Sequence, residues 1–180
     1  MLALLLSSPA DTRRLGRVVA QTLVPPALVL LRGDLGTGKT TLVRQVARAA
    51  GVTEPVVSPS FTIAQTYAAR RGTVVNHLDL YRLQVGADVD LFSWDDYLTP
   101  DALTFVEWPE SGLEALPAAD LSIELSHRSL TSRDARLSAE EKLERALLER
   151  LRAEGLDAGR RSGGADPAFR PSGTGSGGPR

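Results

Sequence analysis

The chain has 180 residues, 42% of them hydrophobic and 24% charged, which suits one domain with a real core and leaves too little for two full-sized domains. Cysteine is absent and only two histidines occur, which excludes a disulfide scaffold and a catalytic thiol and argues against a structural zinc site. The net charge of −1 provides no global basic field for nucleic acid. No apolar run approaches the roughly 20 residues of a membrane helix. The opening run lacks the basic leader of a signal peptide, so we expect a cytoplasmic protein with no membrane partner.

The charges are distributed unevenly along the chain. Residues 1–82 carry ten Lys or Arg against four Asp or Glu, whereas residues 83–127 carry ten acidic residues and no Lys or Arg. This division predicts a cationic face suited to phosphate groups. It also predicts an acidic lobe that binds a metal or a basic partner, or that simply stays solvated. Lys39 is conspicuous because it is the only lysine before residue 142.

The first 51 residues predict alternating strands and helices. The expected elements are a buried strand over 2–6, a helix from Ser8-Pro9 to the prolines at 25 and 26, a strand over 27–31, and a helix over 39–50 that Gly51 closes. The strand over 27–31 is apolar throughout, which is typical of a central parallel strand covered on both faces.

The remaining chain predicts more strands, one helix and a tail. The expected elements are strands over 61–68, 73–80, 103–107 and 121–126, an acidic helix or loop over 88–98, and a helix that a capping box opens at Ser138–Glu141. Residues 155–180 contain eight glycines and three prolines without apolar periodicity, which predicts a disordered tail. The folded domain is therefore expected to cover residues 1–154.

A glycine-rich loop carries the strongest chemical signal. Residues 33–40 read Gly-Asp-Leu-Gly-Thr-Gly-Lys-Thr and match G-x-x-x-x-G-K-[ST] without a mismatch. The glycines let backbone N–H groups turn toward phosphate oxygens, and the helix that follows directs its positive end at the same anion. Lys39 would reach the β- and γ-phosphates, and the Thr40 hydroxyl would ligate Mg²⁺. The expected nucleotide-binding residues are Gly33, Gly36, Thr37, Gly38, Lys39, Thr40 and Thr41.

Two other classes of P-loop protein can be compared with this pattern. A Ras-type GTPase needs an N/T-K-x-D guanine motif, and no lysine is placed to make one. A small-molecule kinase is harder to dismiss, because Arg128, Arg133 and Arg136 cluster after the last predicted strand. Kinases use such arginines to neutralise the transferred phosphoryl group.

Three further segments follow the P-loop in order and give a closer match. They read Ser-Pro-Ser-Phe-Thr over 58–62, His-Leu-Asp-Leu-Tyr-Arg-Leu over 77–83 and Val-Glu-Trp-Pro-Glu over 106–110. Together with the P-loop they resemble the TsaE (YjeE) family, the small bacterial ATPase of tRNA threonylcarbamoyladenosine synthesis. The resemblance covers roughly residues 8–137. Ser60 departs from the threonine usual in that family but keeps the hydroxyl.

This resemblance implies ATP binding, slow ATP hydrolysis, and Mg²⁺ held by Thr40 and Glu107. It also implies that Arg133 lies near the nucleotide. The implied partners are the TsaD threonylcarbamoyl transferase and its TsaB companion, which act on adenosine 37 of tRNAs that read ANN codons. Contact with the tRNA itself is expected to be indirect.

The chemistry of individual residues can be argued from the pattern alone. Asp79, near the end of a strand beside the P-loop, fits the position that holds a Mg²⁺ water or orients the attacking water, or else it is a solvated strand acid. Glu107 ends an apolar strand, so its carboxylate should emerge at the edge where parallel sheets bind ligands. His77 fits packing or hydrogen bonding better than catalysis, and Trp108 fits the core or a partner surface equally well. Residues 58–62 read as a switch that senses the γ-phosphate, or as a plain loop.

These observations predict a single α/β P-loop NTPase domain with a mostly parallel sheet, an antiparallel edge and flanking helices. Three functions share the same pocket. The first is a switch ATPase that serves tRNA modification, in which Lys39, Asp79 and Glu107 carry the chemistry. The second is a small-molecule kinase, and the third is a nucleotide-gated binding module in which hydrolysis is incidental.

Overall fold

A computed structural model describes residues 1–82, 93–111 and 116–160. The helices and strands are β1 (Leu2–Leu6), α1 (Pro9–Thr22), β2 (Ala27–Arg32), α2 (Lys39–Ala50), β3 (Ala64–Ala68), β4 (Val74–Asp79), β5 (Ala102–Glu107), β6 (Leu121–His127), β7 (Arg133–Ala139), α3 (Glu141–Ala153) and β8 (Ala158–Arg160). Short 3₁₀ turns lie at Arg70–Gly72, Trp94–Asp96 and Pro109–Ser111. Within these ranges, no helix has the length and apolar character needed to cross a bilayer.

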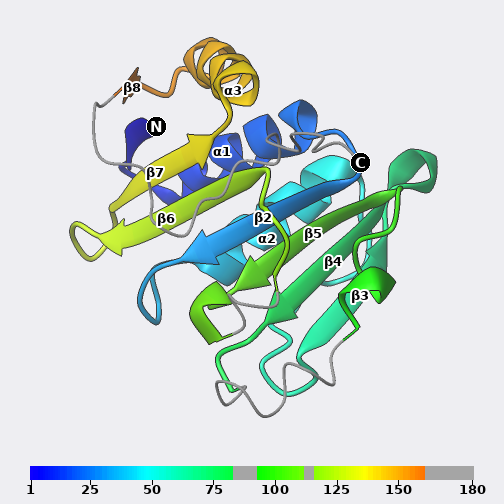
Figure 1. Ribbon diagram of the computed structural model, residues 1–180. Coiled ribbons are helices and arrows are strands. Elements are labelled where there is room, and N and C mark those ends of the chain that lie inside the picture. Colours follow the sequence, from blue (N-terminus) through cyan, green and yellow to red (C-terminus); the bar gives the residue numbers. More distant parts are fainter. Residues whose placement is uncertain (83–92, 112–115, 161–180) are drawn as a thin grey trace, which may run out of the picture.

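The strands form one sheet in the order β3-β4-β5-β2-β6-β7-β1-β8 (Figure 1). The central strands β4, β5, β2 and β6 run parallel, and β3, β7, β1 and β8 join by antiparallel pairing on the two sides. The expected α/β P-loop class, with a parallel centre and flanking helices, is confirmed. Antiparallel strands border the parallel centre on both sides rather than at a single edge.

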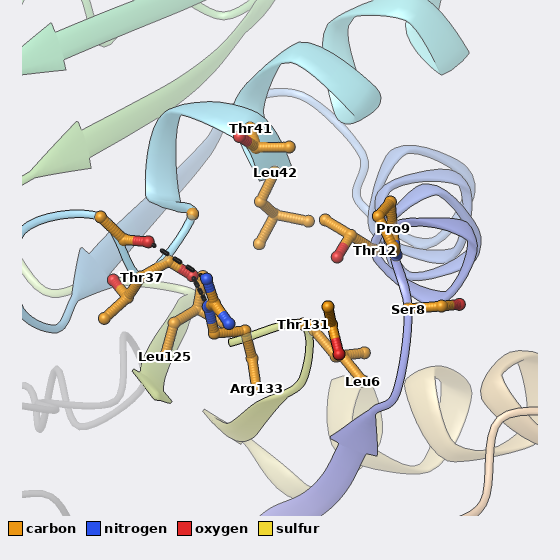
Figure 2. A pocket seen from close by; sticks show the side chains of 12 residues that line it. Leu6, Ser8, Pro9, Thr12, Thr37, Thr41, Leu42, Leu125, Thr131 and Arg133 are labelled. Atoms are coloured by element: carbon orange, nitrogen blue, oxygen red, sulfur yellow. Dashed lines mark hydrogen bonds between the residues drawn. The ribbon is translucent and has the colours of Figure 1, made fainter. Parts of the chain in front are cut away.

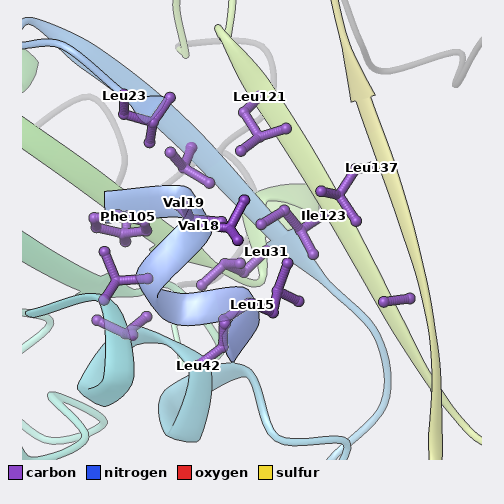
Figure 3. Packing of buried hydrophobic residues seen from close by; sticks show 14 of the residues in the cluster. Leu15, Val18, Val19, Leu23, Leu31, Leu42, Phe105, Leu121, Ile123 and Leu137 are labelled. Carbon is purple, nitrogen blue, oxygen red and sulfur yellow. The ribbon is translucent and has the colours of Figure 1, made fainter. Parts of the chain in front are cut away.

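Two apolar layers enclose the sheet. Helices α1 and α2 pack on one face with buried residues of α3, and Figure 3 shows Leu15, Val18 and Val19 of α1 against the strands. The opposite face of the parallel strands carries Leu30 and Val106, which residues of the 94–98 segment partly cover. Strand β2 is therefore buried on both sides, as its unbroken apolar run predicts.

The structure corrects the sequence expectations in the last third of the chain. Residues 133–139 form β7, paired with β6 and β1, so the helix expected from Ser138 begins at Glu141 instead. Ala135 and Leu137 of β7 are buried while Asp134 and Arg136, which alternate with them, are not, and this is the two-residue period of a strand. The capping-box pattern is a local signal, and pairing with two neighbouring strands overrides it.

The domain also continues past residue 154. Leu156 and Ala158 are buried in the main core, and β8 pairs antiparallel with β1. The expectation of a disordered tail over 155–180 is therefore wrong for residues 155–160, and the remainder of that range lies outside the described residues. Of the helix or loop expected over 88–98, residues 93–98 are described and contain the 3₁₀ turn Trp94–Asp96, and residues 88–92 lie outside the described residues.

Candidate functional site

The P-loop turns between β2 and α2, at the edge where the parallel strands end. Gly33 follows β2, and Gly38 adopts a left-handed conformation directly before the first residue of α2. The carboxyl ends of β4 and β5 lie at the same edge, since Asp79 is paired with Glu107 in register and Glu107 with Leu31 of β2. The topology therefore collects the loop and both candidate acids in one place, as expected for an open parallel sheet.

Lys39 is buried inside its own loop. Its Nζ donates hydrogen bonds to the carbonyl oxygens of Gly33 at 2.5 Å and Asp34 at 3.0 Å. The same ammonium lies 3.9 Å from the ring centroid of Trp108, within the range of a cation–π contact. Burial lowers the pKa of Lys39, and the Glu107 carboxylate opposes that shift. The two carbonyl contacts and the Trp108 ring thus hold the Lys39 side chain inside the loop.

Thr40 and Glu107 meet across the site. The Thr40 hydroxyl donates to Oε1 of Glu107 at 2.7 Å, although the two residues lie 67 positions apart. Hydroxyl and carboxylate oxygens are the hard ligands that Mg²⁺ prefers. Among the described residues, no group of three or more His, Asp or Glu side chains could hold a metal. Thr40 and Glu107 could hold Mg²⁺ as the protein's two ligands in a site that phosphate oxygens would complete.

The Asp79 carboxylate is hydrogen-bonded to the segment over 58–62. Its Oδ2 accepts hydrogen bonds from Ser60 Oγ at 2.7 Å and Ser58 Oγ at 3.3 Å. Its Oδ1 accepts the backbone N–H of Tyr81 at 3.1 Å. The carboxylate is buried, so Asp79 is not a solvated strand acid. The contacts with both serines make the segment over 58–62 part of the site rather than a separate loop.

The site includes two further residues, His77, for which the sequence predicts packing or hydrogen bonding, and Trp108, which the sequence left between the core and a partner surface. His77 is fully buried, and its Nε2 lies 2.7 Å from Oε1 of Glu107. Trp108 has a φ of 56°, a conformation rare for a bulky side chain, and its ring lies against both Lys39 and Tyr81. Two features of the sequence point to these residues: His77 shares a strand face with Asp79, and Trp108 directly follows Glu107.

Arg133 reaches the P-loop from β7. Its Nε donates to the Thr37 carbonyl at 3.1 Å and its Nη2 lies 3.5 Å from the Gly36 carbonyl, the contacts marked in Figure 2. Its Nη1 donates to the Ser129 carbonyl at 3.0 Å in the turn before β7. Arg133 therefore ties that turn to the outer side of the P-loop.

A cavity of about 170 Å³ opens beside these contacts. Figure 2 shows it between the start of α2, the start of α1 and the β6–β7 turn. Its lining residues are Leu6, Ser8, Pro9, Thr12, Gly36, Thr37, Gly38, Thr41, Leu42, Leu125, Thr131 and Arg133. The lining combines apolar walls with hydroxyl groups, a composition typical of small-molecule sites. The contribution of residues 6–12 was not foreseen from the sequence.

The arginine cluster that suggested a kinase is divided in the structure. Arg133 faces the P-loop, whereas Arg128 pairs with Asp134 and Arg136 pairs with Glu124. Both pairs are well exposed, and Arg128, Asp134 and Arg136 line a different hollow, over β1 and β7. The three arginines therefore do not converge on one phosphoryl group.

Comparison with known proteins identifies a family. The family model described as threonylcarbamoyl adenosine biosynthesis protein TsaE matches residues 6–135. A TsaE protein of Nostoc sp. is 32% identical over 142 residues, which cover 77% of this chain and 86% of the relative. One from Synechocystis sp. is 42% identical over 111 residues, covering 59% and 69%.

A solved structure extends the comparison to the fold. The crystal structure of Bacillus subtilis YdiB superposes with a TM-score of 0.69 at 25% identity, and the match covers 86% of this chain and 97% of YdiB. The matched family region contains the P-loop, both buried acids and Arg133. On these grounds the chain belongs to the TsaE family of threonylcarbamoyl adenosine biosynthesis proteins.

Proposed function

We propose that this chain binds ATP with Mg²⁺ and hydrolyses it slowly, as the ATPase component of tRNA threonylcarbamoyladenosine synthesis. The observation that supports this most is the convergence of the P-loop Lys39 and the Thr40–Glu107 contact at one strand edge. A P-loop followed by a helix, with a carboxylate beside the loop hydroxyl, is the arrangement that binds a triphosphate and its metal.

Each residue has a separate part in the proposed hydrolysis. Lys39 turns from the loop carbonyls toward the β- and γ-phosphates as a mobile point charge. Thr40 and Glu107 hold Mg²⁺, which supplies positive charge to the phosphate oxygens. Asp79 accepts a hydrogen bond from the attacking water and so orients the water oxygen toward the γ-phosphorus. Ser58 and Ser60 hold the Asp79 carboxylate in place and connect it to the loop before β3.

The cavity next to Gly36 and Gly38 is the proposed place for the base and ribose. It adjoins the phosphate loop, and the hydroxyls of Ser8, Thr12 and Thr131 belong to its lining. Arg133 shapes this pocket through its bonds to the loop carbonyls, so we assign it a supporting part in nucleotide binding.

The proposed partners are proteins of the TsaD and TsaB type, which modify adenosine 37 of tRNAs reading ANN codons in the cytoplasm. The family to which the chain belongs supports this assignment. The net charge of −1 favours contact with tRNA through these partners rather than directly.

ATP turnover of two variants tests the assigned chemistry. Lys39→Ala and Glu107→Ala should each lower the hydrolysis rate at least about 100-fold, because phosphate contacts and metal each supply several kcal/mol of transition-state stabilisation. Lys142→Ala and Glu124→Ala are matched controls, since both side chains are exposed on other elements. Near-wild-type rates for both site variants would refute the assignment.

Reconstitution tests the pathway. Purified TsaD and TsaB type proteins, tRNA and threonylcarbamoyl-adenylate are combined with and without this chain and ATP. We expect multiple turnovers of modification only when the chain and ATP are both present. Equal turnover without the chain would contradict the proposed role, and phosphate transfer to a small acceptor would support the kinase function instead.

A further inference from the structure

His77 lies directly beneath the proposed metal site and has no assigned part in it. It is on β4, two residues before Asp79, so the two side chains share one face of the sheet. The imidazole is completely buried, and Phe105 of β5 lies beside it in register. Its Nε2 is 2.7 Å from Oε1 of Glu107. Any role for this imidazole at the metal rests on the proposed function, the binding of ATP with Mg²⁺.

Two hydrogen bonds converge on one oxygen of Glu107. Oε1 receives both the His77 Nε2 contact and the Thr40 hydroxyl, each at 2.7 Å. No hydrogen bond from the described residues reaches Oε2. A carboxylate with one oxygen held from two directions cannot rotate freely, so the direction of its second oxygen is also determined.

The other nitrogen of His77 argues against a purely structural role. Nδ1 is buried and has no hydrogen-bond partner among the described residues. A buried polar atom without a partner is unfavourable for folding, and an apolar side chain at this core position would avoid that cost. The imidazole is therefore better explained by what Nε2 does for Glu107 than by core packing.

We propose that His77 is a positioning residue that orients the Glu107 carboxylate for Mg²⁺. By holding Oε1 beside Thr40, it leaves Oε2 available to the ion or to one of the ion's water molecules. It does not touch nucleotide. Its contribution is to the affinity for the metal that accompanies the nucleotide.

The test compares nucleotide affinity with and without metal in three variants. His77→Leu removes the hydrogen bond, whereas the amide of His77→Gln reaches the position of Nε2 and restores it. His77→Asn stays polar but reaches only the position of Nδ1, so it serves as the matched polar control. Calorimetry measures the binding of a non-hydrolysable ATP analogue in excess Mg²⁺ and in EDTA.

We expect the Leu and Asn variants to lose about 10–100-fold of the Mg²⁺-dependent gain in affinity, the range found for partners of metal ligands. The Gln variant should stay within about threefold of wild type, since it keeps the donor. Affinity in EDTA should be unchanged in all three variants. A purely structural role would lower both affinities together.

Two outcomes would overturn the inference. One is wild-type Mg²⁺ dependence in the Asn variant, and the other is an equal loss for Gln and Asn. The comparison of Gln with Asn remains decisive even if the Leu variant does not fold. Failure of wild-type protein to bind the analogue at all would instead refute the proposed function itself.

Discussion

The substitution Gly33→Ala should push the P-loop away from the neighbouring strand β6. Gly33 has a φ of +124°, and a Cβ built there would lie 2.0 Å from the carbonyl oxygen of Leu125 in β6. Ordinary contacts of that kind are at least 3.4 Å, so backbone must move by more than 1 Å. Gly38 offers a matched comparison: its φ is +105°, and a Cβ there meets nothing within 4 Å.

The expected loss of stability has two terms. Holding alanine at a positive φ costs about 1–3 kcal/mol, which applies to both variants. Forcing the backbone apart adds about 1–3 kcal/mol in Gly33→Ala only. The middle of each range gives a loss of about 4 kcal/mol for Gly33→Ala and about 2 kcal/mol for Gly38→Ala. In a domain of this size 1 kcal/mol lowers Tm by about 2–4 °C, so we expect Tm to fall by roughly 8–16 °C for Gly33→Ala and roughly 4–8 °C for Gly38→Ala.

Thermal unfolding followed by circular dichroism without nucleotide measures both shifts. Nucleotide is left out because binding would raise Tm and obscure the comparison. If the two variants melted at the same temperature, the close approach of Gly33 to β6 would not contribute to stability and the reasoning would be refuted. A Gly33→Ala protein as stable as wild type would refute it more strongly.

Three further changes test other parts of the site. Asp79→Asn should lower ATP hydrolysis at least about 100-fold in a phosphate-release assay while the Kd for Mg·ATP changes little, because the carboxylate that orients the attacking water acts on the chemical step. A matching loss of affinity would contradict this, and unchanged hydrolysis would favour the binding-module function. Lys39→Met should abolish nucleotide binding measured by calorimetry. Burial lowers the pKa of Lys39 in the folded protein, so the unfolded chain binds this proton more tightly. The free energy of unfolding of the wild type should therefore rise with pH until the ordinary lysine pKa of 10.5 is passed, and Lys39→Met should remove that rise. Lys142→Met is its control, and denaturant titrations from pH 8 to 11 would expose the error if both proteins kept the same slope. Arg133→Met should lower Tm by at least about 3 °C, since hydrogen bonds to charged groups contribute about 1.5–3 kcal/mol, and it should weaken nucleotide binding, whereas Arg136→Met should do neither.

Local patterns were sufficient where neighbouring residues make the structure. The apolar run over 27–31, the glycine loop and the helix over 39–50 all form as expected. The position of Glu107 at the end of its strand was also predictable, because an apolar strand read in order shows which side chain emerges last. The strand over 133–139 was not predicted, and a helix start was expected at its end, at Ser138. A helix-start pattern is a local signal, whereas this strand depends on partners elsewhere in the chain.

Sequence alone determined the glycine-rich loop, because the backbone N–H groups and the lysine that make such a loop are contiguous. Tertiary structure decided how the loop is completed. Glu107 meets His77 across 30 positions and Thr40 across 67, and Arg133 reaches Thr37 across 96. Such contacts depend on the order and register of strands that are distant in the chain, which no local periodicity encodes.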